Sequence, residues 1–188
     1  MPPTPAASIL RCHREPPVWL AGDLTIRRYD PAEFDSVLAL HRLGLASVGV
    51  RPGDGVYYEY DLFQMEQLYL RDGGEFLVGM IAPGQIVAMG GLRRHHPDFD
   101  TPLDMGYEHV GEMVRLRVHP SVQRRGHGTA MVLALEERAH ELGYRMLVAD
   151  TTSGQAAALG LYGKFGWYEI HREIVGDLVN VYLAKLLR

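Results

Sequence analysis

Apolar and polar positions repeat along the chain with periods that predict alternating strands and helices. Leu24–Tyr29 combines β-branched, apolar and aromatic residues and predicts a short strand. A helix begins directly after it, because Asp30 can cap the helix, Pro31 suits its first position and Glu33 completes a capping box. The apolar stripe of this helix ends near Gly49. The pattern therefore starts with one strand and one amphipathic helix.

The later segments continue this alternation. In order, we predict a helix over 57–70, a hairpin of Glu75–Ala82 and Ile86–Leu92, a strand over Val110–Val118, a long helix over Gly126–Leu142, a buried strand over Arg145–Ala149, a helix over 155–164, and strands over Trp167–Ile174 and Val179–Leu186. No repeat or low-complexity tract interrupts them. Residues 22–188 are therefore expected to form a single α/β domain with a mixed sheet.

The first 21 residues differ from the rest of the chain. Residues 1–21 hold five of the eleven prolines and show no apolar periodicity, so we expect a loose N-terminal tail. They contain no apolar core of a secretory signal, and no run in the chain reaches the length of about 18 residues that a membrane span needs. The one cysteine, Cys12, lies in this tail, which argues against a disulfide framework or a thiolate zinc cluster. We expect a reducing, cytoplasmic setting and no membrane partner.

Composition adds a contrast between the whole chain and one short segment. The 188 residues carry 19 Lys and Arg against 23 Asp and Glu, a formal net charge of −4. This balance argues against a nucleic-acid partner, because proteins that bind the phosphate backbone usually present a basic face. Residues 112–128 are locally basic, however, with one glutamate against four arginines: Arg115, Arg117, Arg124 and Arg125.

This basic segment contains the most specific chemical feature of the sequence. The strand over Val110–Val118 ends at Pro120, and a turn from Gln123 to Gly128 then leads straight into a long helix. Such a turn presents unpaired amide N–H groups at the positive end of the helix dipole, and glycine lets the backbone approach a ligand closely. The turn is therefore a candidate cradle for a phosphate or a pyrophosphate.

Other interpretations of this turn remain open at this stage. Glycines at a helix start can serve packing alone. A dinucleotide-binding fingerprint would need a third glycine where Met131 stands, and a P-loop would need Ser or Thr where Phe165 follows Gly163 and Lys164. Both of those phosphate-binding motifs are poor matches.

Two motifs together resemble the GNAT N-acetyltransferase superfamily. Its pyrophosphate motif is matched by Gln123-x-x-Gly126-x-Gly128 after a V-x-P strand end. Its second signature, N-x-x-A-x-x-L-Y-x-K-x-G-F, is matched by Gln155-x-x-Ala158-x-x-Leu161-Tyr162-x-Lys164-x-Gly166-Trp167. The chain departs from this signature at Gln155, whose amide reaches one methylene further than the usual asparagine. The resemblance covers residues 22–188, and its specific motifs lie in 112–167.

The resemblance implies a fold of the α+β type, with a mixed, largely antiparallel central sheet flanked by helices. It implies acetyl-CoA as co-substrate, bound by a core over 110–167 that includes Leu116, Arg117, Val118, Gln123, Arg124, Arg125, Gly126, His127, Gly128, Thr129, Gln155 and Ala158. The pantetheine arm would pair with the strand end at Leu116–Val118, and the Leu116 N–H would donate to the developing oxyanion. Dimers are common in the superfamily, which leaves a homodimer open. The nine histidines show no metal-binding spacing, so no metal is expected.

Glu112 and Tyr162 are the two catalytic candidates. Glu112 matches the position of the catalytic glutamate in histone-type members, and strand alternation would place it beside Leu116 and Val118, where burial would raise its pKa. It can equally be an ordinary strand-edge carboxylate, with water as the base and His109 as a weaker substitute. Tyr162 would protonate the leaving thiolate, or it is simply a packing residue of an amphipathic helix.

The expected activity is acetyl transfer from acetyl-CoA to a primary amine, of a small molecule or a peptide, by direct attack in a ternary complex. An acyl-enzyme is not expected, because the chain has no G-x-S-x-G elbow and Cys12 lies in the tail. The rival hypothesis is a CoA-binding sensor or interaction module without catalysis. The resemblance implies that the helix over 57–70 and the preceding loop Val50–Asp61 shape the acceptor pocket. Aromatic and acidic residues there, and acids in a later loop, would suit a cationic amine or be solvated charge: Asp98, Asp100, Asp104 and Glu108.

Overall fold

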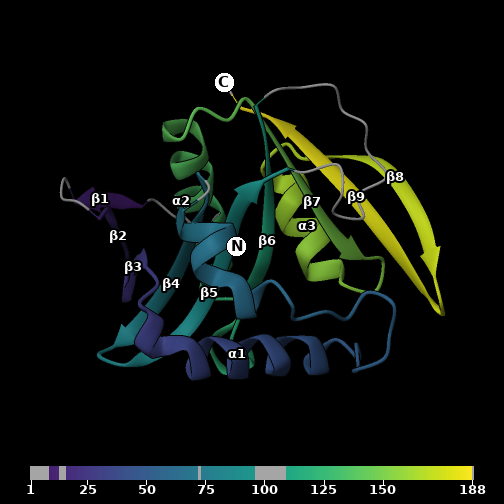
Figure 1. Ribbon diagram of the computed structural model, residues 1–188, viewed down its shortest axis with the longest axis horizontal. Coiled ribbons are helices and arrows are strands. Elements are labelled where there is room, and N and C mark those ends of the chain that lie inside the picture. The colour runs from purple at the N-terminus through teal and green to yellow at the C-terminus, as the bar shows by residue number, and fades with distance from the viewer. Residues whose placement is uncertain (1–8, 13–15, 72, 96–108, 188) are drawn as a thin grey trace, which may run out of the picture.

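The computed structural model describes residues 9–12, 16–71, 73–95 and 109–187, and the strands in these ranges join one sheet. The sheet follows the order β1-β2-β3-β4-β5-β6-β7-β9-β8, from the purple edge to the yellow edge in Figure 1. Every neighbouring pair is antiparallel except β6 and β7, which confirms the expected mixed, largely antiparallel sheet. The strands are Leu10–Cys12 (β1), Val18–Ala21 (β2), Leu24–Arg28 (β3), Glu75–Ala82 (β4), Gln85–Arg94 (β5), Val110–Val118 (β6), Met146–Thr152 (β7), Tyr168–Val175 (β8) and Leu178–Leu186 (β9).

Helices cover both faces of this sheet, which we call the α1 face and the α2 face. On the α1 face, Leu40 packs in one buried cluster, and α1 crosses the lower part of Figure 1. On the α2 face, Met131 of α2 and Tyr162 of α3 share the larger cluster. The three helices are Phe34–Ser47 (α1), His127–Glu141 (α2) and Ala156–Lys164 (α3).

The predicted start of the first helix is confirmed. Asp30 Oδ1 accepts from the Ala32 N–H at 2.9 Å, and the Asp30 N–H donates to Glu33 Oε2 at 3.0 Å. This capping box satisfies amides that a helix start leaves unpaired. The first turn, Pro31–Glu33 (η1), is a 3₁₀ turn that continues into α1.

The expectation of a loose tail over residues 1–21 is wrong for the part that the structure describes. β1 pairs with β2 and β2 with β3, so the sheet begins at Leu10. Trp19 is fully buried among residues of β3 and α2, because β2 turns its side chain onto the α2 face. The sequence pattern did not predict β2, because only two of its side chains, Val18 and Trp19, are buried and the residues around it are polar or proline. Cys12 therefore lies in the sheet, in β1.

The helix predicted over 57–70 forms only in its second half. Residues 57–59 have no regular structure, and a 3₁₀ turn, Leu62–Gln64 (η2), is followed by a π-helix, Glu66–Arg71 (η3). The Tyr58 and Tyr60 rings stack 5.3 Å apart, and the buried Asp61 binds side chains of the sheet. These tertiary contacts override the helical pattern.

A bulge in β6 decides where a site can form. The register of β5 and β6 shifts beside Arg115, whose φ of 58° lies in the left-handed region. The extra residue reverses the alternation of side chains. Val114 therefore packs on the α1 face, whereas Leu116 packs on the α2 face. The expectation that Glu112 shares a face with Leu116 and Val118 is wrong for this reason.

β6 and β7 separate after Glu112, before the bulge. They pair only over Val110–Glu112 against Met146–Val148. β7 continues along β9 as far as Thr152, and the rest of β6 continues along β5. Within the described residues, the backbone of β6 after Glu112 therefore has no strand pairing on its β7 side.

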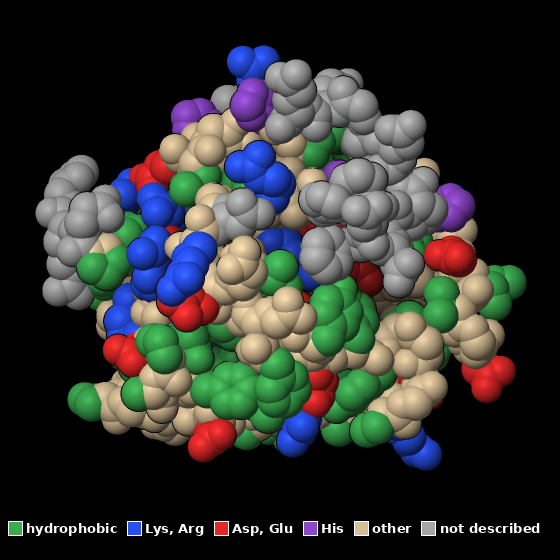
Figure 2. Space-filling view, viewed as in Figure 1, with side chains coloured by type: hydrophobic (Ala, Val, Ile, Leu, Met, Phe, Trp, Pro, Cys, Tyr) green, Lys and Arg blue, Asp and Glu red, His purple; other side chains and the backbone are tan. Residues whose placement is uncertain are grey.

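The exterior shows one concentration of apolar side chains in Figure 2, over the lower part of the view where α1 lies in Figure 1. Leu43, Val48 and Phe63 are among the exposed large apolar residues of this part of the chain.

None of the described helices is long and apolar enough to cross a membrane. In the same residues, no group of three His, Cys, Asp or Glu side chains could hold a metal ion.

Candidate active site

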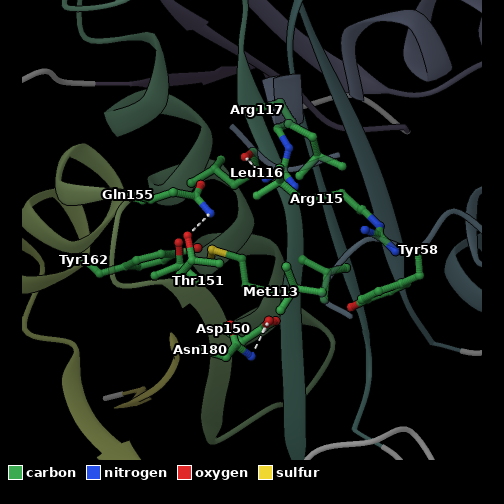
Figure 3. Close-up of a pocket in the computed structure, with 16 residues that line it drawn as sticks. Tyr58, Met113, Arg115, Leu116, Arg117, Asp150, Thr151, Gln155, Tyr162 and Asn180 are labelled. Carbon is green, nitrogen blue, oxygen red and sulfur yellow. Dashed lines mark hydrogen bonds between the residues drawn. The ribbon is translucent and has the colours of Figure 1, made fainter. Parts of the chain in front are cut away.

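A pocket lies where β6 and β7 separate. In Figure 3, Tyr162 points toward its middle from α3, Tyr58 lies on the opposite side, and Arg117 stands across from Asp150 and Asn180. The predicted residues Leu116, Arg117, Gln155, Ala158 and Tyr162 line it, whereas Glu112 and Val118 do not. The full lining is Leu45, Val50, Val56, Tyr58, Met113, Val114, Arg115, Leu116, Arg117, Asp150, Thr151, Thr152, Gln155, Ala158, Tyr162 and Asn180.

Arg115 at the bulge is held by a buried carboxylate. Its Nε donates to Asp61 Oδ2 at 2.8 Å and its Nη2 to Asp61 Oδ1 at 2.5 Å, and Tyr69 also donates to Asp61. The Arg115 guanidinium lies 4.0 Å from the centre of the Tyr58 ring. Burial raises the pKa of Asp61, but the charge and hydrogen bonds of Arg115, the hydrogen bond of Tyr69 and the charge of Arg93 together hold this pKa below its usual range. Arg115 and Tyr58 thus line one side of the pocket, and Asp61 fixes Arg115 there without lining the pocket itself.

Glu112 sits in a different environment from the one we expected. Arg93 Nε donates to its Oε2 at 2.5 Å, and His95 Nδ1 lies 2.9 Å from its Oε1. Burial raises the pKa of Glu112, but His95 and Arg93 together bring it below the usual value. The expected raised pKa is therefore wrong, because sequence alternation could not reveal an arginine on the neighbouring strand. Both carboxylate oxygens are engaged away from the pocket.

Tyr162 is a buried tyrosine at the edge of the pocket. Only 4% of the residue is exposed, and its ring packs 4.9 Å from the Trp167 ring. Burial, and then the negative charge of Asp150, raise its pKa well above the usual range. The hydroxyl therefore stays protonated at neutral pH and lines the pocket.

The glycine-rich turn has the backbone of an anion cradle. Gly126 has φ 91° and forms the N-cap of α2, and no side chain caps the helix. The first amides of α2 are therefore without a capping group among the described side chains. Gly128 leaves room for α3, because a Cβ there would lie 3.3 Å from Leu161 Cδ2. Arg124, with φ 64°, and Arg125 are exposed on the turn.

The side chains of two other predicted cofactor residues turn elsewhere. Gln123 Nε2 donates to the Val118 carbonyl at 3.1 Å and fastens the turn to the end of β6. His127 is buried, and its Nε2 lies 3.0 Å from Asp23 Oδ1, in the turn between β2 and β3. Its imidazole thus binds the chain itself, which leaves its backbone amide to face a ligand. Thr129 is half-buried in the first turn of α2.

Gln155 takes the N-cap position of α3 at the rim of the pocket. Its Nε2 donates to Thr152 Oγ1 at 3.1 Å, and no cap bond from its side chain to the helix is formed. Ala158, one turn into α3, lines the pocket and packs against the α2-face cluster. The second motif therefore lies beside the first, across the opening between β6 and β7.

Comparison with known proteins agrees with this geometry. The family model described as "Acetyltransferase (GNAT) family" matches residues 40–167. The chain belongs to the GNAT family of acetyltransferases. No curated protein matches it.

Several solved structures resemble this GNAT acetyltransferase. A GNAT-family acetyltransferase from Staphylococcus aureus is 18% identical, with a TM-score of 0.71 over 88% of this chain and 99% of that one. A ribosomal-protein-alanine N-acetyltransferase from Brucella melitensis is 22% identical, with a TM-score of 0.68 over 86% and 99%. A phosphinothricin acetyltransferase from Sinorhizobium meliloti, in complex with acetyl-CoA, is 16% identical, with a TM-score of 0.68 over 88% and 89%. These identities show a shared fold.

The polar residues of the GNAT pocket that the sequence did not reveal include Asp150, Thr151, Thr152 and Asn180. Asp150 directly follows the predicted buried strand, a place where polar residues often meet a ligand, so its position was a usable signal. Asn180 lies on β9, and its sequence context gives no such signal. The loop acids named above (Asp98, Asp100, Asp104 and Glu108) lie outside the described residues.

Proposed function

We propose that this GNAT protein transfers an acetyl group from acetyl-CoA to a primary amine, by direct attack in a ternary complex. The observation that carries the proposal is the opening between β6 and β7, next to the uncapped start of α2. A bound acetyl-CoA would extend from the turn over 123–129 to this opening. The acetyl-CoA in the Sinorhizobium relative supports the same co-substrate here.

The residues of the turn fit a diphosphate. Gly126 in a left-handed conformation aims the uncapped amides of α2 outward, and Arg124 and Arg125 add exposed positive charge. The unpaired edge of β6 at Leu116–Val118 would bind the pantetheine arm by backbone hydrogen bonds. Acetyl-CoA supplies a thioester carbonyl that an amine can attack.

The residues around that carbonyl would then do three things. The Leu116 N–H would donate to the developing oxyanion. Tyr162 would give its proton to the departing thiolate, and its raised pKa means that the hydroxyl is protonated when the thiolate forms. The amine would lose its proton to water, because Glu112 is bound to Arg93 and does not line the pocket.

Two measurements test this proposal. Acetyl-CoA at 100 times its Kd should raise the unfolding free energy by about 2.7 kcal/mol, and a panel of amines should release free thiol. Gly126→Ala should lose this stabilisation, whereas Gly84→Ala, which carries the same kind of positive φ in the β4–β5 turn, should keep it. Stabilisation without thiol release from any amine would identify a non-catalytic CoA-binding module. Absence of stabilisation would exclude both functions.

A further inference from the structure

The α1 side of the pocket contains a cation without a counter-ion. Arg117 Nη1 donates to the Leu116 carbonyl at 2.8 Å, and its Nε is buried without a hydrogen-bond partner. None of the described carboxylates lies within ion-pair distance of Arg117. Arg93 and Arg115, by contrast, are each bound by a carboxylate, of Glu112 and Asp61. Of these three arginines, Arg117 alone has no carboxylate partner among the described residues and can bind a ligand.

The fold keeps Arg117 in this costly position. Burial, and then the charge of Arg115, lower its pKa to about 10, so it is still charged at neutral pH. Its stem lies against α1, where a Cβ on Gly44 would be only 2.5 Å from Arg117 Cδ. Glycine at this helical position makes room for the side chain. A partly buried cation without a counter-ion destabilises the fold, which is typical of a group kept for binding.

An unpaired acceptor lies across the pocket from Arg117 in Figure 3. Asn180 is 5% exposed, and its Oδ1 has no hydrogen-bond partner. Its Nδ2 donates to Asp150 Oδ2 at 3.1 Å, and Asp150 itself is exposed. Asn180 Oδ1 and the Asp150 carboxylate together offer acceptors to a group that carries N–H donors and positive charge.

These groups lie on the other face from the predicted cofactor groups. Asp150 follows Val148 by two residues in β7, and Val148 packs with Val110 of β6, which precedes the bulge on the α1 face. Tyr162 and Ala158 pack on the α2 face, as does the helix that begins at the turn. Arg117 and Asp150 are therefore placed for the acceptor and not for the phosphates.

We propose that the acceptor is a zwitterionic amino acid, with its carboxylate bound by Arg117 and its ammonium group by Asp150 and Asn180 Oδ1. A pocket with one unpaired cation facing one carboxylate matches the two charges of such a molecule. This inference rests on the proposed acetyl transfer and adds the class of acceptor to it.

The reaction balances with these groups. The ammonium group gives one proton to water, and its nitrogen attacks the thioester carbonyl carbon. The new C–N bond forms, the C–S bond breaks, and the thiolate takes the Tyr162 proton, which solvent replaces. The amide nitrogen loses a second proton to water. The products are CoA and an N-acetyl amino acid, whose neutral amide no longer attracts Asp150 and so favours release.

Matched acceptors test the inference directly. Thiol release would be measured with the twenty L-amino acids, with the amino acid amides and with the decarboxylated amines. At least one amino acid should have a kcat/KM about 10- to 100-fold above that of its amide and its amine. This ratio corresponds to the free energy of one charge-assisted hydrogen bond. The same amino acid should raise the melting temperature of the CoA-bound protein, and its amide should not.

Variants of Arg117 assign the preference. Arg117→Gln should lower kcat/KM for the amino acid by about the same 10- to 100-fold, chiefly through KM, and leave the amide unchanged. Arg117→Lys should restore part of the preference. The control Arg172→Gln, at an exposed site on β8, should change neither. Melting curves with acetyl-CoA would show that each variant is folded.

The outcomes separate this inference from the proposed function. Thiol release that is equal or faster with amides, amines or peptides would overturn the amino acid acceptor and keep the acetyltransferase. An equal loss for amino acid and amide in Arg117→Gln would also overturn it. No thiol release with any amine would overturn the proposed function and this inference together.

Discussion

Single side chains around the pocket divide into those that are paired within the fold and those that are left for ligands. Arg115 takes a left-handed conformation that costs an L-residue roughly 1–2 kcal/mol, and its bonds to Asp61 offset that strain. Arg117, two residues further along β6, receives no such partner. Two arginines close in sequence thus differ: Arg115 is bound to Asp61 within the fold, and Arg117 is the one that we propose binds the acceptor.

The same division explains which residues the sequence could identify. Tyr162 and Gly126 belong to local motifs whose spacing is visible in the chain. Tyr162 lines the pocket, and Gly126 is the N-cap of α2. Glu112 was misjudged because its environment depends on Arg93, 19 residues away on β5. Asn180 was missed because it reaches the pocket only through the pairing of β7 with β9.

Tyr162→Phe isolates the proposed proton donor. The ring still packs on Trp167, so the fold and acetyl-CoA binding should be kept, while loss of the hydroxyl should lower kcat by about 100-fold or more. The rate of thiol release would measure kcat, and a titration with acetyl-CoA would measure cofactor binding. Tyr168→Phe, at an exposed tyrosine, is the matched control. An unchanged kcat in Tyr162→Phe would remove the role of general acid.

At the scale of elements, the site depends on one irregularity in one strand. The pattern of Val110–Val118 correctly predicted β6, because alternating apolar residues specify a strand. It could not predict the bulge, because no glycine or proline stands at or next to Arg115 to mark one. The bulge reverses the alternation of side chains along β6, and β6 separates from β7 after Glu112. The pocket therefore depends on how these two strands are placed in the sheet.

Trp19→Ala tests whether the N-terminal strands are part of the folded domain. Trp19 is fully buried between β3 and α2, so removal of its side chain should lower the free energy of unfolding by about 3–5 kcal/mol. Leu20→Ala, next to it and 39% exposed, should cost less than about 1 kcal/mol. Urea unfolding of the three proteins would give these values. Equal midpoints for Trp19→Ala and the parent protein would instead favour a loose tail.

Across the whole molecule, charged groups from distant segments meet between α1 and the sheet. Glu59 and Asp61 come from the segment after α1, Arg115 and Arg117 come from β6, and His41 lies among them, fully buried. Neither His41 nitrogen has a hydrogen-bond partner. Burial, and then the charge of Arg115, lower the pKa of His41 to about 3. The fold therefore holds this histidine neutral. The position of His41 in α1 does not by itself predict this, because the charges around it come from other segments.

This neutral histidine predicts how stability depends on pH. The unfolded chain binds a proton at His41 below about pH 6.5, whereas the folded protein does not until about pH 3. Because the folded pKa is lowered, stabilisation is complete above pH 6.5 and is lost as the pH falls toward 3. The free energy of unfolding should fall by up to about 1.4 kcal/mol per pH unit from this group.

His41→Leu should flatten that dependence between pH 6.5 and 4.5, a window that lies above the titration of ordinary carboxyl groups. Leucine has no polar atom to leave unpaired at this buried site, so the variant should fold and be more stable than the parent at pH 5. Urea unfolding at intervals of half a pH unit would measure both slopes, with His140→Leu at an exposed position as the control. Equal slopes for His41→Leu and the parent would mean that His41 is protonated inside the fold, and that the arginines beside it do not repel a further charge.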